Sequence, residues 1–265
     1  MKLTGLFKVS LISASVMLAA CGGDINISEG DVDNSTVVNN PATDGGDNTP
    51  DPVQDNALIT AGIATDVSAE FPTITDKPVY RIAQDTTFTA DATLTNDAHW
   101  VLTGRTAVGG DKVDSAVLTI EAGTTIFGEA GEDFLVVRRG SQIEAVGTAA
   151  APIIMTSVQD VTGEETGIGQ WGGLVLLGNA PANSCGDQTG DTTPSELEGC
   201  GVSAEGDAGQ FGGTDEADNS GTLRYVVVKH AGRTLGNGDE LNGISFAGVG
   251  SATSVEYIQV HENLD

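Results

Sequence analysis

Short apolar segments separated by glycine corners recur along the second half of this chain. Residues 116–126 can be set against residues 133–143, and Gly123 then falls on Gly140. Residues 223–228 align with residues 255–260 at an offset of 32, which places Tyr225 on Tyr257. A quasi-period of 17 to 32 residues predicts a solenoid of stacked β coils, because each coil buries its inward side chains only against its neighbours.

The composition also favours an all-β chain. Its 36 glycines, few aromatic residues and many Thr, Val and Ala indicate short strands with tight turns. No stretch of helical length shows a capped apolar period of 3.6 residues. An antiparallel sandwich is the alternative fold, although it would show hairpin dipeptides more evenly.

Four segments look like the right-handed parallel β-helix proteins of bacterial surfaces. They are Trp-Val-Leu-Thr-Gly at 100–104, Leu-Thr-Ile-Glu-Ala-Gly-Thr-Thr-Ile-Phe-Gly at 118–128, residues 143–157, and Trp-Gly-Gly-Leu at 171–174. The resemblance spans about residues 98 to 265 and implies a right-handed parallel β-helix with a secreted or surface location. It implies no single activity, since such helices host both adhesins and polysaccharide lyases.

The chain divides into four expected parts. Residues 1–20 are a lipoprotein signal peptide, 21–56 an acidic disordered linker, 57–115 an N-terminal cap region, and 116–265 the coils, with an insertion at 182–220. The linker has no Lys or Arg and is too polar to bury a core. The coils stop at Asp265 without a polar cap, which favours a partial or truncated sequence.

The amino terminus has the pattern of an export signal. Lys2 and Lys8 precede a short apolar run that is too short to span a membrane. Leu-Ala-Ala-Cys at 18–21 looks like the lipobox of bacterial lipoproteins. This resemblance implies cleavage before Cys21 and acylation of Cys21, with palmitate among the attached acyl chains. An ordinary secretory signal is the alternative. The residue directly after Cys21 is Gly22 and not aspartate, and an aspartate there would resemble an inner-membrane retention signal. The outer membrane is therefore favoured.

With Cys21 assigned to the anchor, two cysteines remain. Cys185 and Cys200 flank a stretch rich in Gly, Asp and Thr, and in an oxidising compartment we expect them to form a disulfide. Metal ligation is the weaker alternative, because no His or Cys lies nearby at C-x-x-C spacing.

The charge is strongly acidic. Of 11 Lys and Arg, two leave with the signal, so the mature chain has 9 basic against 38 acidic residues. This balance excludes nucleic acid as a partner. It suits cation binding or simple solubility.

The acidic insertion and the end of the chain hold the candidate site residues. Calcium could bind through Asp187, Asp191, Asp207 and Asp215, although no EF-hand pattern occurs. The lyase candidates are Lys229, Arg233 and His261, with Lys229 stacking near His261 and His230 near Glu262. The alternative is an exposed ladder of opposite charges. Trp100 and Trp171 could stack on sugars or pack in the core.

We therefore expect a lipid-anchored envelope protein, periplasmic or surface-facing, with a binding or structural role. Its predicted partners are the membrane, through the anchor, and a polysaccharide or an outer-membrane protein. The competing hypothesis is a calcium-dependent lyase of acidic polysaccharides, in which case Ca²⁺ is the one cofactor. No hydrolase or nucleotide motif occurs.

Overall fold

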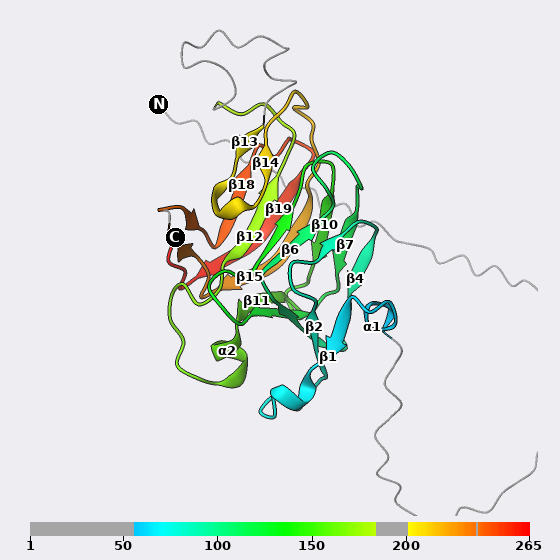
Figure 1. Ribbon diagram of the computed structural model, residues 1–265, viewed down its shortest axis with the longest axis vertical. Helices are drawn as coiled ribbons and strands as arrows, with labels where there is room; N and C mark the ends of the chain where they lie inside the picture. Colours follow the sequence, from blue (N-terminus) through cyan, green and yellow to red (C-terminus); the bar gives the residue numbers. More distant parts are fainter. Residues whose placement is uncertain (1–55, 184–200, 237) are drawn as a thin grey trace, which may run out of the picture. The chain divides into compact units, whose positions relative to one another are not determined.

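The computed structural model describes residues 56–183, 201–236 and 238–265, which form a stack of strands with few helices (Figure 1). The predicted linker up to residue 55, Cys21, Cys185 and Cys200 lie outside the described residues. Most neighbouring strands come from successive coils and pair in parallel. The predicted parallel β-helix is confirmed, and the sandwich alternative is wrong.

The first face of the helix runs along the whole stack. It begins with β1 (Ala64–Asp66), which pairs antiparallel with β2 (Val79–Ile82). All later pairs are parallel, through β5 (His99–Leu102), β8 (Thr125–Gly128), β11 (Ile153–Ser157) and the second halves of β15 (Gly221–Lys229) and β19 (Ser254–His261).

The second face joins the first at a sharp corner. It contains β4 (Ala92–Leu94), β7 (Val117–Ile120), β10 (Gln142–Val146) and the first halves of β15 and β19. In β15 and β19 the chain bends from the second face to the first at one residue, Tyr225 with φ 49° in β15 and Tyr257 with φ 55° in β19. Because this left-handed backbone is rare for a bulky residue, the two tyrosines mark the corner.

The third face is parallel throughout. Its strands are β3 (Thr87–Phe88), β6 (Arg105–Val108), β9 (Phe134–Val137), β12 (Gly173–Leu177) and β18 (Ile244–Ala247). Three faces per coil enclose the apolar core, and their outer surfaces are left for the connecting segments.

Several short helices and strand pairs lie outside the three faces. They are α1 (Ala57–Thr60), η1 (Ser68–Glu70), α2 (Val158–Thr162), η2 (Glu205–Asp207), and two antiparallel pairs, β13 (Val202–Ser203) with β14 (Gln210–Phe211) and β16 (Arg233–Thr234) with β17 (Glu240–Leu241). Asn56 caps α1, since its side chain accepts a hydrogen bond from the amide of Leu58.

Inward side chains stack into ladders from coil to coil. Trp100, Ile126, Met155 and Val228 are successive partners on the first face, and each is fully buried. Neighbouring strands lie roughly 4.8 Å apart, so the side chain in one coil is covered by those above and below. The ladders are the core of the protein.

The two repeats seen in the sequence have different structural meanings. The offset of 32 is a true stacking register, because Val228 pairs with Val260 and the rings of Tyr225 and Tyr257 lie parallel with centroids 4.5 Å apart. The offset of 17 is not, since Ile120 pairs with Ala145. Both glycines of that shorter repeat turn corners of the helix, and similar corners occur more than once within a coil.

Parallel coils already occur within residues 57–115, the range assigned to the cap region. Strands β2 to β6 all pair with the next coil, so among the described elements α1, β1 and η1 precede the parallel stack. Leu58 of α1 is 6% exposed and packs on the core.

The final described coil is less covered than the others. Phe246, Val255 and Val260 face inward but are 43%, 44% and 51% exposed. Their partners in the preceding coil, Leu176, Leu223 and Val228, are fully buried. Burial of the inward side chains of a coil therefore requires a coil packed on each side of it.

The ladders make a direct stability prediction. Replacing Ile126, in the middle of the stack, with alanine leaves a cavity that neighbouring coils cannot fill, and we expect Ile126→Ala to lower the free energy of unfolding by about 2–5 kcal/mol. Urea unfolding followed by circular dichroism measures it. Val113→Ala, at a side chain that is 59% exposed, is the control, and an equal loss in both variants would contradict ladder packing.

Candidate functional site: an acidic cleft on the third face

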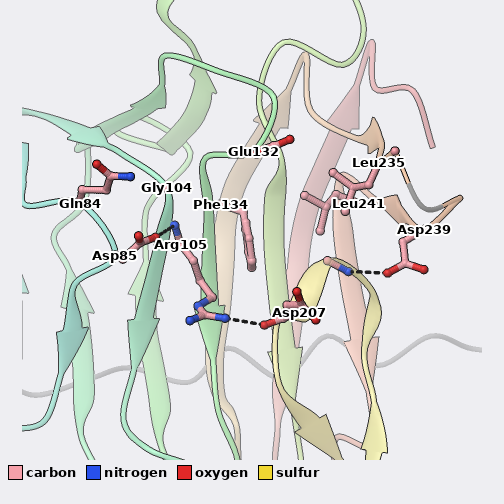
Figure 2. Close-up of a pocket in the computed structure, with 12 residues that line it drawn as sticks. Gln84, Asp85, Gly104, Arg105, Glu132, Phe134, Asp207, Leu235, Asp239 and Leu241 are labelled. Carbon is pink, nitrogen blue, oxygen red and sulfur yellow. Dashed lines mark hydrogen bonds between the residues drawn. The ribbon is translucent and has the colours of Figure 1, made fainter.

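A cleft of about 540 Å³ lies against the outer side of the third face (Figure 2). We call it the acidic cleft. It is lined by Gln84, Asp85, Gly104, Arg105, Glu132, Phe134, Gly206, Asp207, Leu235, Gly236, Asp239 and Leu241.

The strands supply one wall of the cleft. Arg105 begins β6 and Phe134 begins β9, and the two residues are partners in adjacent coils. Phe134 points outward and packs in an apolar cluster with Leu241 at the end of β17. The cleft therefore has an apolar base beneath a polar rim.

The second part of the insertion, from residue 201 on, forms the opposite wall. Ala208 is fully buried and belongs to the same apolar cluster as Val136 and Val175 of the third face. The guanidinium of Arg139, which is only 3% exposed, binds Asp111 and donates to the carbonyl of Gly212 at 2.8 Å. These contacts fasten the segment to the coils.

Hydrogen bonds tie the cleft residues to one another. Arg105 Nη1 donates to the carbonyl oxygen of Asp207 at 2.6 Å, and the amide of Gly206 donates to Asp239 Oδ2 at 3.3 Å (Figure 2). Asp85 Oδ1 accepts from the amide of Arg105 at 3.0 Å. Gly104 is required here, since a Cβ on it would lie 2.5 Å from that same carboxylate oxygen.

A buried carboxyl shapes the turn beside the cleft. Asp133 is 5% exposed and accepts hydrogen bonds from the amides of Gly104, Glu129 and Ala130 at 2.6, 2.8 and 2.7 Å. Burial raises the pKa of Asp133 despite these donors. The turn holds Glu132, the next residue back, at the rim of the cleft.

The cleft is rich in hydrogen-bond acceptors. Four carboxylates, those of Asp85, Glu132, Asp207 and Asp239, line it with a single guanidinium, that of Arg105. Among the described residues, Glu132 forms no hydrogen bond or ion pair, so its carboxylate is free to accept from a ligand. Hydroxyl and amine donors suit such a surface, whereas anionic groups are repelled.

A second polar group lies where the first face ends, and we call it the polar corner. It consists of Asp160, Lys229, His230, His261 and Glu262. Lys229 Nζ lies 2.5 Å from Asp160 Oδ2, and His230 Nδ1 lies 3.5 Å from Glu262 Oε2. The register pairs Lys229 with His261, as the offset of 32 predicts. Asp160, on α2, was not foreseen.

The other predicted site residues do not gather there. Arg233 lies against the turn at Gly131, whose added Cβ would come within 2.7 Å of Arg233 Cδ. Asp207 lines the acidic cleft, and the Asp215 carboxylate accepts from the amide of Ala217 within its own turn. The roles of Lys229, Arg233 and His261 stay predictions.

The calcium hypothesis finds no preformed centre in the part of the chain that is described. No group of three or more His, Cys, Asp or Glu that could hold a metal ion occurs there. Asp187 and Asp191 lie outside the described residues.

Both tryptophans are core residues. Trp100 and Trp171 are fully buried, and each indole N–H donates to a backbone carbonyl, that of Thr95 at 2.9 Å and that of Lys229 at 2.7 Å. The sugar-stacking alternative is therefore wrong for both, and the packing alternative is correct.

The described α-helices are short, with four residues in α1 and five in α2. None of the helices in residues 56–183, 201–236 and 238–265 has the length and apolar character to cross a bilayer.

The stacked coils and their outward cleft define the class, a parallel β-helix protein. Residues 86–265, about two thirds of the chain, match the family described as a pectate-lyase-like β-helix domain. The chain belongs to this family. Comparison with curated proteins and with solved structures found no match.

Sequence reasoning missed the acidic cleft because its residues are distant along the chain. Asp85, Glu132 and Asp239 come from three separate connections, and each looks like an ordinary turn carboxylate. Only Asp207 was singled out, as part of the acidic insertion. The one available signal was that long insertions of solenoids often cover the binding face.

The polar corner predicts a pH dependence. Burial opposes the charged form of Asp160, but hydrogen bonds from Lys229 and Thr156 outweigh it, so the pKa of Asp160 lies below its ordinary 3.8. A carboxyl with a lowered folded pKa stabilises the fold above its ordinary pKa, and this is lost as the pH falls through the lower value. We expect Asp160→Asn to cost about 1 kcal/mol at neutral pH and much less at strongly acidic pH.

Urea midpoints measured at neutral pH and at a pH below the lowered pKa of Asp160 check this expectation. Asp114→Asn, at an exposed carboxylate away from the corner, is the control and should show no such difference. A cost of Asp160→Asn that stays constant with pH would contradict the ion pair.

Proposed function

We propose that this protein is a lipid-anchored component of the bacterial envelope that binds a saccharide in the acidic cleft. The cleft is the observation that carries the proposal. Family membership supports a polysaccharide-related role in general, and the cleft supports the site.

The chemistry of the cleft suits a sugar. Carbohydrates present hydroxyl donors around a ring with apolar C–H faces. The cleft has carboxylate acceptors at the rim and Phe134, Leu235 and Leu241 for apolar contact. Its volume of about 540 Å³ lies within the range of small-ligand sites.

The charge of the cleft favours neutral or amino sugars over uronates. Arg105 is engaged with the Asp207 carbonyl at 2.6 Å, and the four carboxylates would repel a ligand carboxylate.

The anchor is the second part of the proposal and rests on the sequence. The lipobox at 18–21 supports diacylglyceryl attachment at Cys21, and Gly22 supports the outer membrane. The polar segment that follows would hold the β-helix away from the lipid surface.

A glycan array probed with the full-length protein tests the saccharide site. We expect retention of neutral or amino-sugar glycans, and we expect Glu132→Gln to weaken it about fivefold, because a charge-assisted hydrogen bond to the ligand becomes neutral. Glu216→Gln, at an exposed carboxylate outside the cleft, is the matched control. Retention that is equal in both variants would contradict this site.

Partition between detergent and water tests the anchor. We expect the natural protein to enter the detergent phase of Triton X-114 and Cys21→Ala to stay in the aqueous phase, because the acyl chains supply the membrane affinity. A natural protein found in the aqueous phase would contradict lipidation.

The lyase remains a second candidate, and one observation favours it. Lys229 and His261 lie side by side beside Asp160, so a base and charged partners meet at the polar corner. Incubation with acidic polysaccharides and Ca²⁺ would then release unsaturated ends that absorb ultraviolet light. Their loss in Lys229→Ala would favour the lyase, and no absorbance with the natural protein would reject it.

A further inference from the structure

A second cavity lies on a different face of the helix, and we call it the polar cavity. It has a volume of about 300 Å³ and lies against the outer side of the first face. Its floor is formed by His99, Thr125 and Ile154, which are partners in three successive coils. Asp76 lines it from the segment before β2, and Asp160 lines it from α2.

The surroundings show why this space is not a packing fault. Next to it on the same face, Val101 and Phe127 are fully buried beneath an apolar cluster that includes Phe71. At the cavity the floor turns polar. His99 is 9% exposed, its Nε2 lies 3.1 Å from Asp76 Oδ1, and its Nδ1 has no hydrogen-bond partner among the described residues.

The pKa values of both carboxyl groups at the cavity, Asp76 and Asp160, lie below the ordinary value of 3.8. The hydrogen bond from His99 is the largest influence on Asp76 and lowers its pKa. Lys229 and Thr156 lower that of Asp160 against the effect of burial. Lys229 Nζ lies 2.5 Å from Asp160 Oδ2, so the positive charge of Lys229 is already paired with Asp160. The cavity therefore offers carboxylates and threonine hydroxyls to a ligand.

We propose that the polar cavity binds one neutral, hydroxyl-rich ring, a single sugar residue or a cyclic polyol. Hydroxyl donors match its acceptors, and an anionic ligand would meet two carboxylates without a spare cation. Its volume lies at the lower end of small-ligand sites, which limits the ligand to about one ring. The inference is independent of the acidic cleft.

Saturation-transfer NMR on the full-length protein tests the site, with methyl glucoside, methyl galactoside and myo-inositol as neutral probes and methyl galacturonide as the anionic probe. We expect transfer to at least one neutral ring at millimolar concentration and none to the galacturonide. Absence of transfer to every neutral probe would overturn the proposal.

Two variants locate the binding. Thr125→Val keeps the shape of the strand but removes a floor hydroxyl, and we expect affinity to fall about fivefold, as for loss of one hydrogen bond. Thr125→Leu fills the cavity and should abolish transfer. Thr222→Val is the matched control, because Thr222 is also an outward threonine but lies on β15, away from the cavity. This variant should bind normally.

The same variants separate this site from the acidic cleft. Transfer that survives Thr125→Leu would overturn the polar cavity, and a weakening of that transfer in Glu132→Gln would then assign the ring to the acidic cleft. Transfer lost in Thr125→Leu and kept in Glu132→Gln supports it, whatever the glycan array shows. Unchanged circular dichroism in the Thr125 variants ensures that a lost signal reflects the site.

Discussion

Parallel pairing between successive coils is the constraint on which the rest of this structure depends. A coil has no core of its own, so Trp100, Ile126 and Met155 are buried only because each is stacked between like partners. The same stacking aligns the outward positions. His99, Thr125 and Ile154 thereby become neighbours and can form the floor of a cavity.

Covering segments turn the regular outer faces into distinct surfaces. The fold-back of residues 201–211, fastened by Arg139, makes a cleft over the third face. The segment before β2 and the helix α2 flank the polar cavity on the first face. Both sites are acidic, in agreement with the net charge of the chain, and both are better suited to hydroxyl donors than to anions.

The repeat at an offset of 32 predicted real neighbours, including Lys229 beside His261 and Tyr225 beside Tyr257. The offset of 17 predicted a stacking that does not occur, because the corners of one coil share the same strand–glycine–strand pattern. Trp100 and Trp171 could not be assigned from sequence, since a tryptophan that packs and one that binds a sugar are the same residue. Their burial settles the choice in favour of packing.

The sequence by itself determined that the chain is a β-helix, because the alternation of apolar strands and glycine corners is a local pattern that each coil repeats. It also contained the lipobox-like segment at 18–21 and the acidic balance, on which the proposed anchor and the proposed preference for neutral ligands rest. Only the tertiary structure decided which carboxylates meet. Asp85, Glu132 and Asp239 converge through coil stacking and loop docking, contacts between distant residues for which no local pattern exists.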